Sequence, residues 1–97
     1  MFVQINVTPD DIKQGLEAQR WGYGSYVATK MCPLARATRR VIPKAQTSNL
    51  YITTTPGCYQ PIRLPKRAKQ FTIAFDHHEP VQPFSFYVWR DTRDYAA

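Results

Sequence analysis

The chain has 97 residues, of which 43% are apolar and 13% aromatic, so it can build one modest core and is too apolar for a disordered protein. Thirteen Lys and Arg residues against seven Asp and Glu residues give a net charge of +6. The apolar residues are dispersed, which excludes a long apolar span and predicts a protein that does not enter a membrane. We expect a single domain over residues 1–90 and a polar tail over residues 91–97.

Basic residues dominate the middle of the chain. Between Lys13 and Lys69, Glu17 is the only acidic residue, and the other acidic residues lie outside this span. A field of this sign attracts phosphate groups or an acidic protein face, so it is informative about partners and not about the fold.

The first elements have clear local signals. Residues 2–7 alternate apolar and polar side chains, which predicts a half-buried strand, and residues 8–11, Thr-Pro-Asp-Asp, are typical of a helix start. We expect that helix to end at Gly15, because glycine commonly follows the last helical residue. The stretch from Trp21 to Tyr26 contains two glycines and predicts a loop.

A second helix is predicted from Pro33 to about Val41, before Pro43. Helical spacing places Leu34, Ala37, Thr38 and Val41 toward the core. It leaves three arginines largely on the opposite side: Arg36, Arg39 and Arg40. Residues 49–55 predict a strand with Leu50, Ile52 and Thr54 inward, and residues 59–64 predict its hairpin partner across a Pro-Gly turn.

The third helix is predicted to start at Pro65 and to stop by Pro80. Its apolar stripe is Leu64, Ala68, Phe71 and Phe75. A last strand, residues 84–89, places Phe84, Phe86 and Val88 inward. The order β-α-α-β-β-α-β predicts an α+β fold, in which three helices pack on a small, mostly antiparallel sheet.

Few residues suggest catalytic or metal chemistry. His77 and His78 are adjacent, so on a helix they diverge by about 100° and cannot face one ion, which favours a solvated helix end. Cys32 and Cys58 form no CxxC motif and have no nearby histidine in sequence, which favours reduced, buried thiols in the cytosol. We predict no catalytic residues, no metal site and no cofactor.

The basic residues of the third helix are the strongest binding candidates. Lys66, Arg67 and Lys69 crowd the first turns, where the positive helix end disfavours cations unless an anion is present. The alternative is a solvated basic face. Arg36, Arg39 and Arg40 form a second basic group, although Arg39 and Arg40 near a helix C-terminus are also favourable for the dipole.

Aromatic side chains supply a second set of candidates: Trp21, Tyr23 and Tyr26. Such residues stack on nucleic-acid bases or anchor protein interfaces, and they also extend a small core by folding back over it. Tyr87 and Trp89, on the outward face of the last strand, present the same alternatives.

Several segments resemble a group of small uncharacterised proteins encoded by bacteriophages and their hosts. The similarity rests on the opening strand, on Thr-Pro-Asp-Asp-Ile-Lys-Gln-Gly at residues 8–15, on Cys-Pro-Leu-Ala-Arg-Ala at residues 32–37, and on residues 64–86, from Leu-Pro through Phe-Asp to Pro-Phe-Ser-Phe. It covers most of the chain, but residues 20–26 depart from the pattern. The resemblance implies a small phage accessory protein that acts by binding.

The leading functional hypothesis is therefore a non-enzymatic phage accessory protein of the host cytoplasm. Its partner would be an acidic host protein or a nucleoprotein complex, and inhibition of a host defence system is one form of this activity. The alternative is a nucleic-acid-binding protein that uses the basic groups, with Trp21 or Tyr23 stacking on bases. A further alternative, a minor virion or assembly component, requires self-association through a surface such as that of Tyr87 and Trp89.

Overall fold

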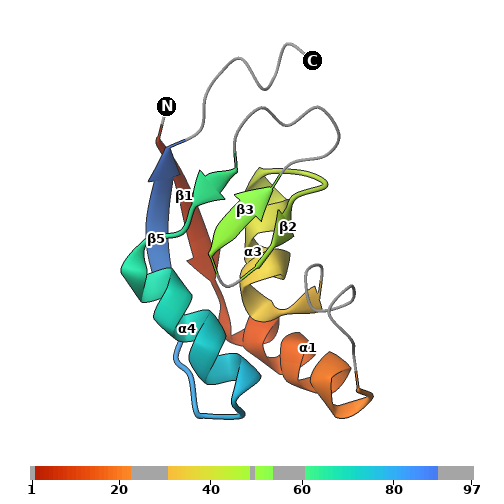
Figure 1. The fold of residues 1–97 in the computed structure, drawn as a ribbon. Helices are drawn as coiled ribbons and strands as arrows, with labels where there is room; N and C mark the ends of the chain where they lie inside the picture. Colours follow the sequence, from red (N-terminus) through yellow and green to blue (C-terminus); the bar gives the residue numbers. More distant parts are fainter. Residues whose placement is uncertain (1, 23–30, 49, 54–60, 90–97) are drawn as a thin grey trace.

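The computed structural model describes residues 2–22, 31–48, 50–53 and 61–89. Its elements in chain order (Figure 1) are β1 (Phe2–Val7), α1 (Pro9–Arg20), α3 (Pro33–Val41), β2 (Gln46–Thr47), β3 (Tyr51–Thr53), β4 (Ile62–Arg63), α4 (Lys66–Asp76) and β5 (Phe84–Trp89). The α+β class, the antiparallel pairing and the order of the predicted elements are confirmed. The short strand β2 is an addition to that order, and the strands divide between two sheets.

The first sheet joins the two ends of the described chain. Strands β1 and β5 pair antiparallel, with Phe2 opposite Trp89 and Val7 opposite Phe84. The alternation along both strands buries one face of this sheet and leaves the other exposed, as predicted for β5. The buried face carries Ile5, Val7, Phe86 and Val88.

The second sheet has the antiparallel order β2-β3-β4. Ile52 of β3 is buried as predicted, whereas Leu50, also predicted inward, is 47% exposed. Leu50 precedes β3 in a turn, where its backbone N–H donates to the hydroxyl of Ser48, so the alternation of the strand does not apply to it. The predicted Pro-Gly turn at residues 56–57 and the inward position of Thr54 lie outside the described residues.

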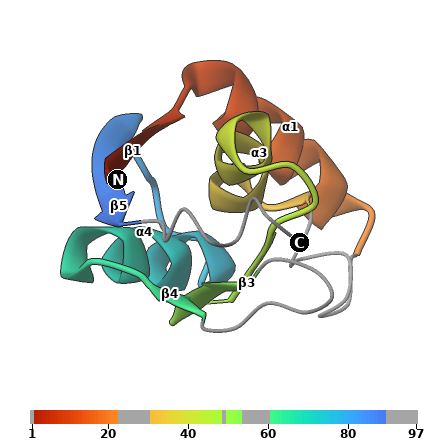
Figure 2. The same cartoon turned by 90° about the horizontal axis from the view of Figure 1, so that it is seen from above.

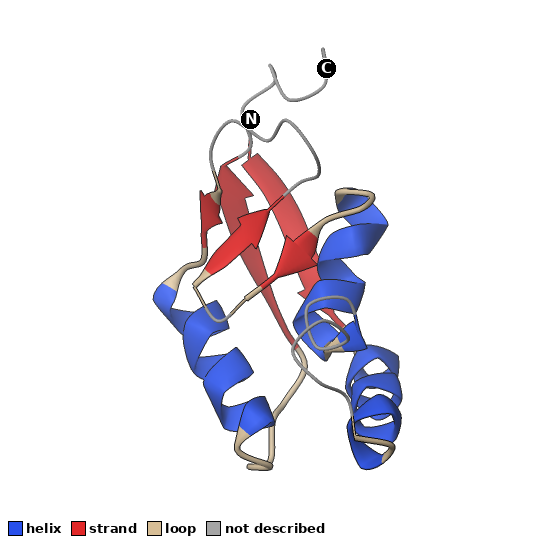
Figure 3. Cartoon of the chain, turned by 45° about the vertical axis from the view of Figure 1, so that its right-hand side comes forward, coloured by secondary structure: helices blue, strands red, loops and turns tan. Residues whose placement is uncertain are grey.

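Figures 2 and 3 show α4 on one side of the molecule and α1 with α3 on the other. Among the described elements, none covers the outer face of the β1–β5 sheet. Buried side chains from β1, α3, β3, α4 and β5 form one core cluster, whose largest fully buried members include Phe75, Ile5 and Leu34. Within the described ranges, no helix is long and apolar enough to cross a membrane.

Helix α1 starts where the sequence predicts. The Thr8 hydroxyl accepts a hydrogen bond from the Asp11 N–H, and the Asp11 carboxylate accepts one from the Thr8 N–H, which together form a capping box. The predicted end at Gly15 is wrong, because α1 continues to Arg20. Gly15 is instead a packing residue, since a Cβ atom there would lie 2.6 Å from Cδ of Pro33.

Helix α3 has the predicted bounds and buries Leu34, Ala37 and Thr38. Val41, predicted to face the core, is 40% exposed. The next residue, Ile42, is the C-cap of α3 and is fully buried in its place. The helix ends at this point, so the spacing of a continuing helix no longer decides which side chain turns inward.

Helix α4 begins one residue after the predicted start, with Pro65 as its N-cap. All four residues of its predicted apolar stripe are buried, and the helix ends at Asp76, before Pro80. This helix closes the core against β5, where the ring centroids of Phe71 and Phe84 lie 4.9 Å apart.

Candidate binding surface

The N-terminal end of α4 carries cations without local compensation. Lys66 and Arg67 are exposed and Lys69 is half-buried, and no acidic residue occupies the first turn. The N-cap residue, Pro65, offers no side-chain hydrogen bond to the free amide groups. These cations therefore lie at the positive end of the helix dipole, where an anion would be favourable.

Arg67 connects this helix end to β5. Its guanidinium group lies 5.2 Å from the centre of the Phe84 ring, within the range of a cation–π contact. Because Phe84 is the first residue of β5, the contact fixes the start of α4 beside the start of that strand.

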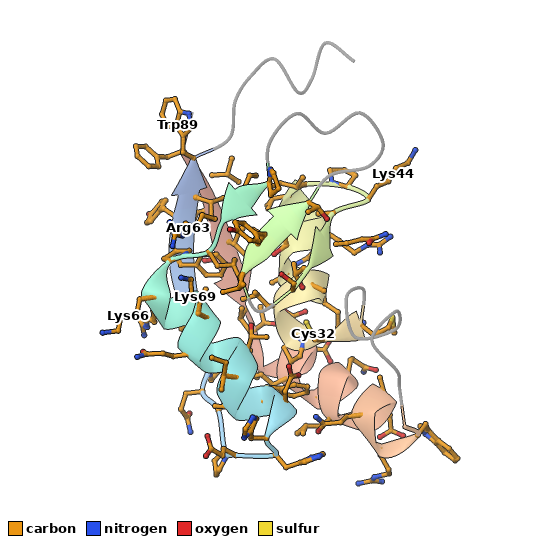
Figure 4. All side chains as sticks on the ribbon, in the orientation of Figure 1. Cys32, Lys44, Arg63, Lys66, Lys69 and Trp89 are labelled. Carbon is orange, nitrogen blue, oxygen red and sulfur yellow. The ribbon has the colours of Figure 1, made fainter. Side chains whose placement is uncertain are left out.

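Arg63 of β4 adds a fourth cation two residues before the N-cap of α4, and its side chain is exposed. Figure 4 shows Lys66 and Lys69 on the first turns of α4 with Arg63 on the same side of the view, whereas Lys44 lies across the molecule. We call Arg63, Lys66, Arg67 and Lys69 the basic end. Among the described residues, no ion pair involves any member of the basic end.

The arginines of α3 differ from the basic end because two of them have internal partners. Arg40 donates to both carboxylate oxygens of Asp11 at 2.5 Å and also to the backbone carbonyl of Asn6. Nε of Arg36 lies 3.6 Å from the same carboxylate, beyond hydrogen-bond distance, and Nη2 lies 3.9 Å from Asp10. These contacts tie α3 to α1 and to the edge of β1.

Asp11 is the centre of this network and its side chain is only 1% exposed. Burial alone would raise the pKa of Asp11, but hydrogen bonds from Arg40 and Thr8 outweigh that effect and hold the pKa below its usual value. The same pair raises the pKa of Arg40. Arg36 and Arg40 therefore stabilise the fold, and we leave them out of the binding surface that we propose.

The structure does not bring the remaining described candidates to the basic end. Arg39 lies in the last turn of α3. Trp21 is 81% exposed and is the C-cap of α1, an end that Figures 1 and 2 both place far from the N-terminus of α4. Tyr23 and Tyr26 lie outside the described residues.

Three other aromatic side chains gather on the outer face of the β1–β5 sheet. Phe2 is 70% exposed, Tyr87 60% and Trp89 59%, and the rings of Phe2 and Trp89 meet edge to face with centroids 5.1 Å apart. We call these three residues the aromatic face. Tyr87 and Trp89 were predicted to point outward. Phe2 was not among the predicted candidates, although the same alternation places it outward. Arg63 was not among them either, because it belongs to a strand and not to α4, although it lies only two residues before the N-cap of that helix.

The cysteine and histidine predictions have separate outcomes. Cys32 is buried at the N-cap of α3, where its sulfur accepts a hydrogen bond from the Ala35 N–H, and burial raises the pKa of its thiol. This thiol is therefore structural and not activated. Cys58 lies outside the described residues.

His77 and His78 are exposed at the end of α4, and the described residues contain no group of three or more side chains suited to hold a metal ion.

Comparison of the chain with protein-family models, with curated proteins and with solved structures found no match. The function must therefore be inferred from the chemistry of these surfaces.

Proposed function

We propose that this chain is a non-catalytic binding protein that holds an acidic partner with its basic end. The observation that carries the proposal is the group of cations at the positive, uncapped start of α4, which has no ion-pair partner among the described residues. Each such cation at a helix N-terminus costs a few tenths of a kcal/mol. Local stability therefore does not explain these residues, whereas an anionic partner does.

The contrast with α3 supports this distinction. There, Arg40 completes a buried carboxylate network, so the fold itself explains the residue. Among the described residues, Arg67 is the one member of the basic end with an aromatic contact, and Arg63 and Lys66 are exposed and available to a partner. A cluster of this kind attracts anions and accelerates their association at low salt.

The proposal extends to the biological setting that the sequence resemblance implies. The protein would be a bacteriophage accessory protein that acts in the host cytoplasm on an acidic host protein or a nucleoprotein complex, including one of a defence system. Its support is the resemblance of residues 8–15, 32–37 and 64–86, together with the basic surface.

The test compares two triple variants with the same change of charge. The first replaces Arg63, Lys66 and Lys69 by Gln and retains Arg67, whose contact with Phe84 contributes to packing. The control replaces three exposed cations elsewhere, Lys13, Arg20 and Lys44, by Gln. Binding of labelled polyglutamate and of a labelled DNA single strand is measured by fluorescence anisotropy across a salt series.

We expect the first variant to keep its melting temperature and to bind the preferred polyanion about tenfold more weakly at low salt. If that polyanion is DNA, the slope of log affinity against log salt becomes shallower by up to about one per lost phosphate contact. The control should lose much less affinity. Equal losses in both variants, or no binding of either polyanion by the wild type, would contradict the proposal.

A further inference from the structure

The β1–β5 sheet buries only one of its two faces. On the outer face, Phe2 stands opposite Trp89, and Gln4 stands opposite Tyr87. All three aromatic rings are more than half exposed. A group of exposed aromatic side chains on two adjacent strands is a candidate surface for contact with a partner.

The cations and the rings lie at the same strand but on opposite sides of it, because Phe84, which contacts Arg67, belongs to the inward set of β5, whereas Tyr87 and Trp89 belong to the outward set. Arg67 is at the Phe84 end of β5, and Trp89 is the last residue of β5. At about 3.3 Å per residue, Tyr87 lies about 10 Å and Trp89 about 17 Å along the strand from Phe84. Figure 4 shows this arrangement, with Trp89 at one end of β5 and Lys66 near the other. Because β5 is an outer strand of its two-stranded sheet, one extended ligand that crosses this strand can reach both the basic end and the aromatic face.

We propose that this ligand is a single-stranded nucleic acid, whose bases stack on the aromatic face while its phosphates meet the basic end. This inference rests on the proposed function and names the class of its acidic partner. Aromatic rings stack on any unpaired base, and the cations of the basic end neutralise phosphates of the nucleic-acid backbone. Gln4, which is exposed opposite Tyr87, supplies an amide group that can hydrogen-bond to base edges.

Charge complementarity favours this ligand over a second copy of the chain, and the accessibility of its bases favours it over a DNA duplex. A second copy of the chain carries the same net charge of +6, so it does not complement the basic end. A DNA duplex offers phosphates, but its bases are stacked inside and present no free ring face to Trp89. A single strand offers both chemical groups at once.

The experiment measures affinity for three probes: a labelled DNA single strand of about 12 nucleotides, the corresponding duplex, and polyglutamate. Trp89→Ala is compared with Trp21→Ala, which removes a ring of the same size that is more exposed and lies at the C-terminal end of α1. Trp89→Phe keeps an aromatic ring at the same position. Circular dichroism confirms that each variant is folded, and both tryptophans are outside the buried core.

We expect the single strand to bind more tightly than the other two probes. Trp89→Ala should weaken single-strand binding by about tenfold or more, with a smaller loss for Trp89→Phe and none for Trp21→Ala. Binding of polyglutamate should not change in any of these variants.

The inference is wrong if Trp89→Ala binds the single strand as tightly as the wild type while the Arg63, Lys66 and Lys69 variant still loses affinity. That result would leave the proposed function intact and would assign binding of the acidic partner to the basic end without the aromatic face. Polyglutamate binding tighter than single-strand binding would also overturn the inference, and it would indicate an acidic protein partner. If the control variant with Lys13, Arg20 and Lys44 replaced by Gln also loses binding to every probe, the proposed function itself is overturned.

Discussion

Replacing Asp11 by alanine is expected to lower the free energy of unfolding by about 3 kcal/mol. The change removes the carboxylate half of the capping box with Thr8 and both hydrogen bonds from Arg40, which are charge-assisted. The remaining Arg40 side chain is 47% exposed, so water solvates its charge and limits the loss. For a domain of this size, the melting temperature should fall by roughly 15 °C.

Asp10 provides the matched control for this prediction. It is the adjacent residue with the same side chain, but it is 70% exposed and lies 3.9 Å from Arg36. Such a surface pair contributes little, so Asp10→Ala should cost less than about 1 kcal/mol. Urea unfolding of both variants measures the difference, and equal losses would show that the Asp11 network does not hold α1 to α3.

The stability that Asp11 provides should depend on pH. Its pKa is lower in the folded protein than its usual value, so its contribution is complete above about pH 4 and disappears as the pH falls through the lower, folded pKa. The unfolding free energies of the wild type and Asp11→Ala should therefore converge in acid. A difference that persists unchanged to pH 2 would contradict the ionised network.

Gly15→Ala is expected to destabilise the protein by about 1 to 2 kcal/mol, although alanine favours helices over glycine by about 1 kcal/mol. The added Cβ would lie 2.6 Å from Cδ and 2.7 Å from Cγ of Pro33. That ring is rigid and buried at the first position of α3, so one of the two helices must move.

A double-mutant cycle isolates this contact. In a Pro33→Ala background the two nearest ring atoms are absent and the backbone nitrogen, 3.1 Å from the added Cβ, remains, so Gly15→Ala should cost much less there than in the wild type. Gln14→Ala, on the exposed side of α1, should be nearly neutral in either background. If Gly15→Ala stabilises the otherwise unchanged protein, the close approach of α1 and α3 is wrong.

Gly15 also shows where sequence reasoning about the fold succeeds and fails. Local signals predicted the helix starts at Thr8 and Pro65 and the alternation of β5, because the residues that cause these features are adjacent in sequence. A glycine that ends a helix and a glycine that admits a neighbouring helix look alike in sequence. Only the contact with Pro33, eighteen residues away, distinguishes them.

The candidate site was partly predictable for the same reason. Lys66, Arg67 and Lys69 lie within one helical turn, so the helix prediction placed them together. The role of Arg40 depends on Asp11, which is 29 residues distant, and the sequence alone could not pair them. Phe2 meets Trp89 only because the first and last described strands are hydrogen-bonded neighbours.

The most direct test of the central claim is an NMR titration of the full chain with a DNA single strand of about 12 nucleotides. The binding account predicts that amide shifts change along β5, at Phe2 and at the first residues of α4, and that α1 and α3 are unaffected. Changes concentrated on α3 around Arg39, or no changes at concentrations where the basic end should be occupied, would contradict the account.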